Sequence, residues 1–262
     1  YNKNKVLRIA NAEGIIHGAE NVLSQGTTEM YRAQVDYPIG YFYGYQTAGI
    51  FQNIQQIEDY RSQGLGVLST AQPGDVIFVD NNRDGAITNA DKTMIGNPHP
   101  DITGGLNLNF GYKGFDLSIT ATGAFGHQIA KSYRSFADSP LQNYTTEVFE
   151  RWHGEGTSNR YPRLTMGSHT NSQYISDIYI EDGDYVKIQN ITFGYDLKSW
   201  FPKMPFGQAR LYFTAQNLYT FTGYSGMDPE IGYGYDQSWV SGIDLGFYPS
   251  PRTYLIGLNL KF

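Results

Sequence analysis

The segment RTYLIGLNLKF, residues 252–262, decides the fold class of this chain. Bulky apolar residues recur at every second position, and the positions between them are mostly polar. The apolar set is Tyr254, Ile256, Leu258, Leu260 and Phe262; the other set is Thr253, Gly257, Asn259 and Lys261, with Leu255 as the apolar exception. This period of two predicts a β-strand with two different faces. A tilted strand needs roughly 9–11 residues to cross a bilayer, which this segment supplies, although a soluble edge strand shows the same pattern.

Composition supports an all-β protein. No run of 18 apolar residues occurs among the 262, so the sequence predicts no transmembrane helix. The chain has 22 Tyr, 15 Phe and 30 Gly, which suits strands joined by many turns or a membrane barrel with aromatic girdles. It has no Cys, and its net charge of −6 comes with no basic patch, so we expect no nucleic-acid partner.

Alternating segments like the first one recur along the chain. We count about six strands, and a phase slip near Gln189 and Asn190 predicts a β-bulge. The six candidates are residues 40–53, 102–112, 115–125, 184–197, 207–221 and 252–262. Short turns at 113–114 and 198–205 alternate with long connections, as in outer-membrane barrels. Six strands cannot close such a barrel, so we expect an antiparallel transmembrane β-barrel of which this chain supplies one part of the wall.

Smaller elements are predicted between these strands. Short strands are expected at residues 6–10 and 31–35, and helical turns at 54–60 and 145–152. Residues 126–182 read as one long loop, which we expect on the extracellular side. Trp200 and Phe201 in the turn at 198–205 indicate either a plain hydrophobic turn or aromatic residues at a membrane interface.

The alternation assigns the two faces of the expected wall. We expect lipid contact from the apolar set, because charge is costly on a lipid-facing surface and tolerated in the lumen. The lipid-facing set is Leu211, Phe213, Ile256, Leu258 and Leu260; the lumen-facing set is Thr214, Gln216, Asn259 and Lys261.

The loop DNNRDGAITNAD, residues 80–91, has the spacing of a calcium site. Asp80, Asn82 and Asp84 occupy loop positions 1, 3 and 5, Ala86 offers a backbone carbonyl at position 7, and Asp91 closes the loop at position 12. Position 12 is Asp rather than Glu, and the flanks do not predict an EF-hand helix pair; dockerin modules offer the closer analogue. The alternative is a metal-free Asx-rich turn held by side-chain to backbone hydrogen bonds.

Four segments, taken together in order and spacing, resemble a known family. They are YPIGYFYGYQTAGIFQ (37–52), GDVIFVDNNRDGAITNADKTMIGNPHPDITGGLNLNFGYKGFDLS (74–118), YIEDGDYVKIQNITFGYDL (179–197) and AQNLYTFTGYSGMDPE (215–230). They are similar to the C-terminal region of SusC/RagA-like TonB-dependent transporters of Bacteroidota outer membranes.

The resemblance implies an active importer of nutrients such as glycan or peptide oligomers in the outer membrane of a Gram-negative bacterium. Its barrel has about 22 strands and a plug. Its partners are a SusD-like surface lipoprotein and the TonB complex. Signal peptide, N-terminal domain, TonB box and plug are not expected in residues 1–262, and Phe262 is expected to act as a signal for barrel assembly.

The sequence also bears on two other classes of function. A soluble, calcium-dependent, carbohydrate-binding all-β module would also show alternating strands, and Tyr and Trp can stack on sugars. An enzyme has little support, because no Ser or carboxylate stands in a recognisable catalytic frame. The five His (His17, His99, His127, His153 and His169) show no ligand-like spacing.

Overall fold

The computed structural model of the chain describes residues 1–23, 26–133, 144–165, 169–231 and 238–262. In this part of the chain, no helix is both long enough and apolar enough to cross a membrane.

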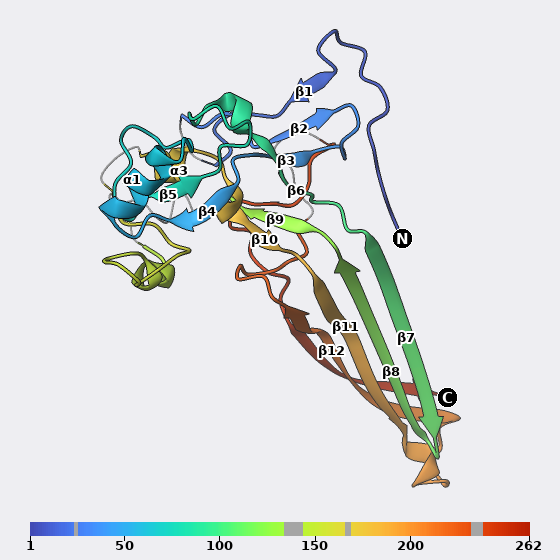
Figure 1. The fold of residues 1–262 in the computed structure, drawn as a ribbon. Helices are drawn as coiled ribbons and strands as arrows, with labels where there is room; N and C mark the ends of the chain where they lie inside the picture. Colours follow the sequence, from blue (N-terminus) through green and yellow to red (C-terminus); the bar gives the residue numbers. More distant parts are fainter. Residues whose placement is uncertain (24–25, 134–143, 166–168, 232–237) are drawn as a thin grey trace.

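Five long strands form one antiparallel sheet in the order β14-β12-β11-β8-β7. They are β7 (Ile102–Tyr112), β8 (Phe115–Phe125), β11 (Tyr185–Asp196), β12 (Gln208–Thr222) and β14 (Thr253–Lys261). Figure 1 shows them running side by side away from a head built by the rest of the chain. We call this sheet the wall. It confirms the all-β, antiparallel prediction.

The wall has five strands, and not the six counted from the sequence. The sixth candidate, residues 40–53, lies in the head as two short strands, β3 (Tyr41–Gly44) and β4 (Thr47–Ile50). Four of its five aromatic residues, Tyr41, Phe42, Tyr45 and Phe51, are buried in the head, so its resemblance to a barrel strand came from Tyr and Phe that pack inside. Residues 6–10 were also predicted wrongly as a strand; they have no regular structure, and Val6 exchanges single backbone bonds with residues 36 and 37.

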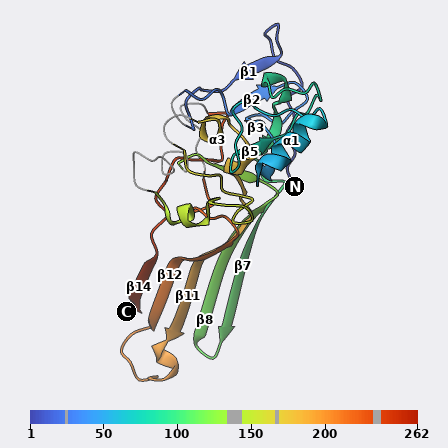
Figure 2. The same cartoon turned by 60° about the vertical axis from the view of Figure 1, so that its left-hand side comes forward.

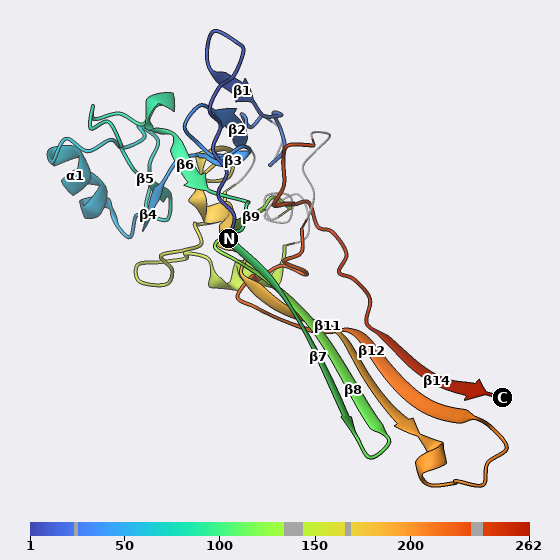
Figure 3. The same cartoon turned by 90° about the vertical axis from the view of Figure 1, so that its right-hand side faces the viewer.

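Short turns gather at one end of the wall and long connections at the other. Lys113 and Gly114 join β7 to β8 with φ of +46° and +86°, the left-handed pair typical of a two-residue hairpin. The other short turn, residues 197–207, begins with the 3₁₀ turn η4 (Leu197–Ser199). Figures 2 and 3 show both turns at the end opposite the head. We call this the turn end.

The predicted bulge is present. The register shifts between Ile188 and Asn190, and Asn217 of β12 has φ of +51°. Ile188 pairs with Ala121 and Ile191 with Ile119, so β11 carries one more residue than β8 between these pairs. Because side chains alternate, the extra residue returns Ile188 to the face that holds Ile191. The slip therefore keeps the apolar face continuous.

The head consists of three small sheets and short helices. The sheets have the orders β1-β2-β3-β6, β10-β9-β13 and β4-β5. The remaining strands are β1 (Ile15–His17), β2 (Tyr31–Gln34), β5 (Val76–Phe78), β6 (Thr93–Gly96), β9 (Gln128–Lys131), β10 (Ile180–Asp182) and β13 (Ile243–Asp244). The helical elements are α1 (Ile54–Ser62), η1 (Asn89–Asp91), η2 (Thr146–Glu150), α3 (Thr170–Gln173) and η3 (Asp177–Tyr179). The strand at 31–35 and the helical turns at 54–60 and 145–152 are thus confirmed, whereas residues 126–182 contain short elements within the expected loop.

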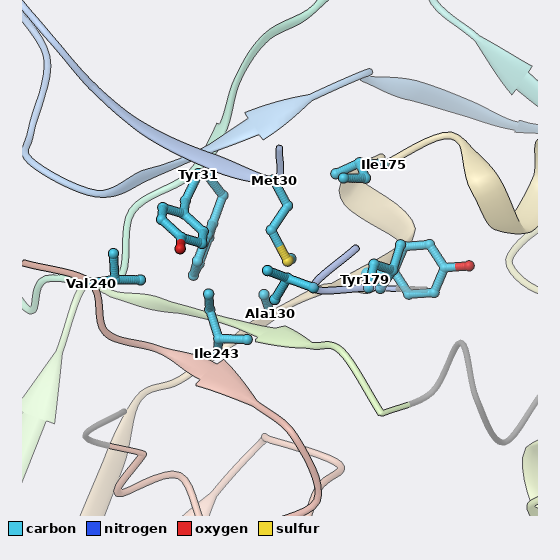
Figure 4. Packing of buried hydrophobic residues seen from close by; sticks show 10 residues of the cluster. Met30, Tyr31, Ala130, Ile175, Tyr179, Val240 and Ile243 are labelled. Atoms are coloured by element: carbon cyan, nitrogen blue, oxygen red, sulfur yellow. The ribbon is translucent and has the colours of Figure 1, made fainter. Parts of the chain in front are cut away.

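The main core of the head joins segments that lie far apart in the sequence. Figure 4 shows Met30 and Tyr31 packed near Ala130, Ile175 and Ile243. These side chains are 2 % exposed or less. Two smaller clusters surround Phe78 and Phe51, and Ile57 of α1 packs into the second. The head therefore has its own hydrophobic core, and none of the core clusters of the described residues includes a residue of the five wall strands.

Candidate functional site

The two faces of the wall follow from the pairing of its strands. Leu211 pairs with Leu258 on one side and Tyr195 on the other; Phe213 likewise lies between Ile256 and Phe193. Directly paired residues point to the same face of a sheet. The pairing therefore gathers the five expected lipid-facing residues on one face, and Thr214, Gln216, Asn259 and Lys261 on the other.

The apolar face is open along its whole width. Ile256 is 80 % exposed and Leu258 52 %. The exposed large apolar residues on this face are Ile102, Leu106, Leu108, Phe110, Tyr112, Phe115, Phe125, Val186, Phe193, Leu211, Phe213, Tyr219, Phe221, Tyr254, Ile256, Leu258 and Leu260. A contiguous apolar surface of this extent marks a place where another apolar phase or molecule binds. Its exposure is what the lipid-facing prediction requires.

The polar face carries an ion pair that spans three strands. Arg210 of β12 donates to Asp116 of β8 through Nε at 2.8 Å and Nη2 at 2.5 Å. Gly194 of β11 lies between them, and a Cβ there would stand 2.4 Å from Asp116 Oδ1. Glycine is thus required at this position, because the two side chains meet above its backbone. Beside it, the hydroxyls of Thr192 and Thr214 are 2.9 Å apart.

A buried lysine stands at the head end of the same face. Lys187 of β11 is 3 % exposed, and its Nζ bonds Glu230 and lies 3.6 Å from Asp228. Tyr185 donates a second hydrogen bond to Glu230 at 3.2 Å. The sequence prediction missed this group, because its lysine and its acids are 41 and 43 residues apart with no spacing signal to connect them.

The loop at 80–91 lies in the head, where Asp80 organises its first half. Its carboxylate accepts bonds from the backbone N–H groups of Gly66 (3.0 Å), Asp84 (3.2 Å) and Gly85 (2.9 Å). Burial alone would raise the pKa of Asp80, but the backbone amides that bond its carboxylate hold the pKa below its ordinary value. Gly85 has φ of +84°, the conformation expected at loop position 6.

Asp91 organises the second half. It is fully buried and accepts from the backbone N–H groups of Asn81 (3.0 Å) and Thr88 (2.7 Å), forming a capping box at η1. Asp84 accepts from the Ala86 N–H at 2.9 Å and from the Asn82 side chain at 2.8 Å. These bonds are those of an Asx-rich turn, and they account for each carboxylate without a cation.

The acids of this loop are not gathered around a common point. Across the described ranges, no three His, Cys, Asp or Glu side chains stand close enough to hold a metal ion. A carboxylate has about four acceptor positions, so Asp80 and Asp91 keep positions for a cation beside the backbone amides that they accept. The ligand set Asp80, Asn82, Asp84, Ala86 and Asp91 therefore stays a prediction.

The five histidines are dispersed, and several have local structural partners. His169 caps α3 by accepting from the Asn171 N–H at 3.1 Å, and His99 Nε2 lies 2.7 Å from the Ile39 carbonyl. His127 is buried, and burial lowers its pKa while Asp184, 4.0 Å away, opposes this.

Phe262 extends beyond the last strand. It is 93 % exposed, and its ring meets the Phe206 ring edge to face at 5.2 Å. The Gly207 N–H donates to the Lys261 carbonyl at 2.5 Å. The residue is therefore held against the turn at 197–207, while most of its surface remains available.

The relatives found by comparison with known proteins are described as TonB-dependent receptors. The chain is 34 % identical over 268 residues to "TonB-dependent receptor P3" of Formosa agariphila, covering all of this chain and 26 % of that protein. It is 25 % identical over 267 residues to "TonB-dependent receptor SusC" of Bacteroides thetaiotaomicron, covering all of this chain and 24 % of that protein. No family model matches. The chain thus spans about a quarter of the length of these relatives.

Solved structures share the fold. The structure described as the RagAB peptide transporter matches with a TM-score of 0.69 at 20 % identity, covering 98 % of this chain and 26 % of that one. A RagAB peptide importer in a closed state matches with a TM-score of 0.68. The wall and the head are both within the matched region, because 98 % of the chain is covered.

Proposed function

We propose, from the premise that this chain belongs to the SusC/RagA-like TonB-dependent transporters, that it forms part of the barrel wall of an outer-membrane nutrient importer. The observation that carries the proposal is the apolar face, which stays exposed across all five strands while the opposite face holds ion pairs and hydroxyls. Lipid covers such a face and water fills the lumen behind it.

The wall needs neighbours on both sides. β7 and β14 stand at the two ends of the sheet order, and an uncovered strand edge pairs with another strand. In the proposed importer these edges pair with strands of the remaining barrel, which encloses the plug. Energy reaches the barrel from the TonB complex through parts of the transporter outside this chain.

The head has the position of the extracellular loops. Long connections of outer-membrane barrels lie outside the cell and short turns lie in the periplasm. The head therefore faces the medium, where a SusD-like lipoprotein would cover it. Its cargo would be glycan or peptide oligomers; one structural relative is described as a peptide transporter. We assign the chain no catalytic role, and its named relatives are receptors and transporters.

The soluble-module alternative is not favoured. A soluble sheet of five strands covers its apolar face with a second layer. The apolar residues of this wall are exposed, and the described segments outside the wall strands and their two short turns fold into the head. A soluble protein would therefore leave a large aggregation-prone surface in water.

Two neighbouring residues test the proposal. Arg at Leu258 places a charge on the lipid-facing side, at a cost of about 2–4 kcal/mol near the bilayer midplane. Arg at Asn259 places the same charge on the polar face and is the matched control. We expect Leu258→Arg to reduce the amount of heat-resistant, folded transporter in outer-membrane fractions, and Asn259→Arg to leave it near the wild-type amount.

Equal behaviour of the two variants would contradict the assignment of faces. Recovery of the wild-type protein in the aqueous fraction, without detergent, would overturn the membrane role itself and return the soluble module as the better explanation.

A further inference from the structure

The two short turns at the turn end of the wall are in contact with each other. The Asp196 N–H donates to the Gly114 carbonyl at 2.8 Å, which ties the turn at 197–207 to the hairpin at 113–114. Ser199 packs so closely on Gly114 that a Cβ there would stand 2.4 Å from its Oγ. The two turns therefore present one continuous surface.

Aromatic side chains on this surface extend the apolar face. The Trp200 ring meets the Tyr195 ring edge to face at 5.3 Å, and Tyr195 packs on Phe115 at 4.3 Å. Tyr195 and Phe115 pair directly and lie on the apolar face. Trp200 is nevertheless 70 % exposed, and Phe201 beside it is exposed as well. The apolar face thus ends, at the turn end, in the rings of Trp200 and Phe201, which remain largely exposed in the described structure.

The charge of the turn end is opposite to that of the whole chain. The chain carries 19 Lys and Arg against 25 Asp and Glu. The turn end holds five of the bases, Lys113, Lys198, Lys203, Arg210 and Lys261, and two of the acids, Asp116 and Asp196.

Both of these acids have partners within the protein. Asp116 is bound by Arg210, and Asp196 accepts from the Lys198 N–H at 3.0 Å. Lys113 and Lys203 are exposed, and Lys198 Nζ lies 3.2 Å from the Gly207 carbonyl, near the surface. Lys113 Nζ also lies 5.2 Å over the ring of Tyr112, at the last residue of β7. The turn that carries the two aromatic rings therefore also carries Lys198 and Lys203, and the hairpin tied to it carries Lys113.

We propose that the turn end binds anionic phospholipid headgroups, with Trp200 and Phe201 at the acyl boundary and Lys113, Lys198 and Lys203 against the phosphates. Aromatic rings with one apolar side prefer this boundary, and each lysine near an anionic surface adds attraction. The inference rests on the proposed function, which places the turn end at the periplasmic leaflet. It adds a preference for lipid charge that a barrel wall does not by itself require.

Lipid binding to the purified full transporter tests this inference. Native mass spectrometry would compare adducts of phosphatidylglycerol and phosphatidylcholine at equal concentration. We expect the wild type to prefer phosphatidylglycerol, and Lys113→Gln/Lys198→Gln/Lys203→Gln to lose the preference by about fivefold per removed charge. The control Lys3→Gln/Lys5→Gln/Arg8→Gln removes three exposed charges from the head and should keep the preference.

A second pair of variants examines the rings. Trp200→Ser/Phe201→Ser should weaken binding of both lipids alike, whereas the control Phe149→Ser/Tyr248→Ser, at exposed aromatic residues of the head, should leave binding unchanged. Raising the salt concentration should lower the wild-type preference, since exposed charges are screened.

An unchanged preference in the triple Gln variant, or an equal loss in its control, would overturn the inference. So would capture of a periplasmic protein at the turn end in place of lipid. These results are separable from failure of the proposed function. The latter would appear as equal assembly of Leu258→Arg and Asn259→Arg, whatever the lipid preference.

Discussion

Individual residues of the wall take their roles from their partners on neighbouring strands. Arg210 and Asp116 meet although 94 positions separate them, because β11 between them carries Gly194 at the crossing. The buried Lys187 is paired with Asp228 and Glu230, which return to it from a long loop. The alternation of apolar and polar residues predicted the face on which each strand residue lies. The pairing of the strands decided which side chains it contacts on that face.

Calcium binding by the loop at 80–91 is a prediction at this scale. For a millimolar site, 10 mM calcium should raise the free energy of unfolding of the head by about 1.4 kcal/mol. We expect Asp80→Asn and Asp84→Asn to remove this gain, because each loses a carboxylate ligand. Thermal denaturation of the full transporter with calcium, with magnesium and with chelator would measure it.

The control for this measurement is Glu58→Gln on α1, where an exposed carboxylate pairs with Arg61 outside the loop. Its response to calcium should equal that of the wild type. If the wild-type protein unfolds at the same temperature in calcium and in chelator, the loop is a metal-free Asx turn held by its backbone hydrogen bonds.

Elements of the wall depend on irregularities as much as on alternation. The bulge near Ile188 and the left-handed Asn217 restore one continuous apolar face where the sequence changes phase. At the turn end, the 197–207 connection holds the end of β14 through Gly207 and Phe206. The last strand is therefore fixed at the end that carries Phe262.

A substitution at Phe262 tests whether the end of β14 also guides assembly of the barrel. We expect Phe262→Ala to lower the amount of folded transporter in the outer membrane, with uptake per assembled molecule unchanged, because a largely exposed ring contributes little to the finished fold. Quantitative fractionation together with an uptake assay would measure both.

Phe206→Ala provides the comparison, since it removes the other half of the same ring contact. An equal loss in both variants would reduce Phe262 to a packing residue, and wild-type amounts in both would remove any role in assembly.

At the scale of the whole molecule, a buried ion-pair network joins separate segments of the head that no long strand connects. Lys131 of β9 bonds Glu147 at 2.5 Å and Ser225 at 2.8 Å, and lies 3.8 Å from Glu181 of β10. Its side chain is 4 % exposed. One ammonium group thus joins segments from two long loops above the wall.

Lys131→Met should destabilise the head by about 3 kcal/mol, because it leaves buried carboxylates without their cation. The wall should remain folded, since its strands do not contact this group. Limited proteolysis would then cut the head loops faster while the barrel stays resistant to heat in detergent.

Lys5→Met is the matched control, because its pair with Asp36 is exposed and worth about 0–1 kcal/mol. Equal protease resistance of Lys131→Met and wild type would show that the loops are held by their apolar core alone.

The sequence by itself determined the strands of the wall and their faces. Residues 102–112, 115–125 and 252–262 alternate strictly enough that period and turn chemistry fix strand, face and hairpin locally. It also determined the turn at 80–91, whose Asp and Gly positions act through neighbours within a dozen residues.

Tertiary structure alone decided where residues 40–53 belong. Their Tyr and Phe suit a barrel strand and a buried core equally well. Pairing with β2, β5 and β6 and the backbone bond to the distant Ile175 place them in the head. The same holds for Lys187 with Glu230, Arg210 with Asp116, and Lys131 with its carboxylates. Such pairs form because the folded chain brings remote segments together, and no local period or spacing records which segments will meet.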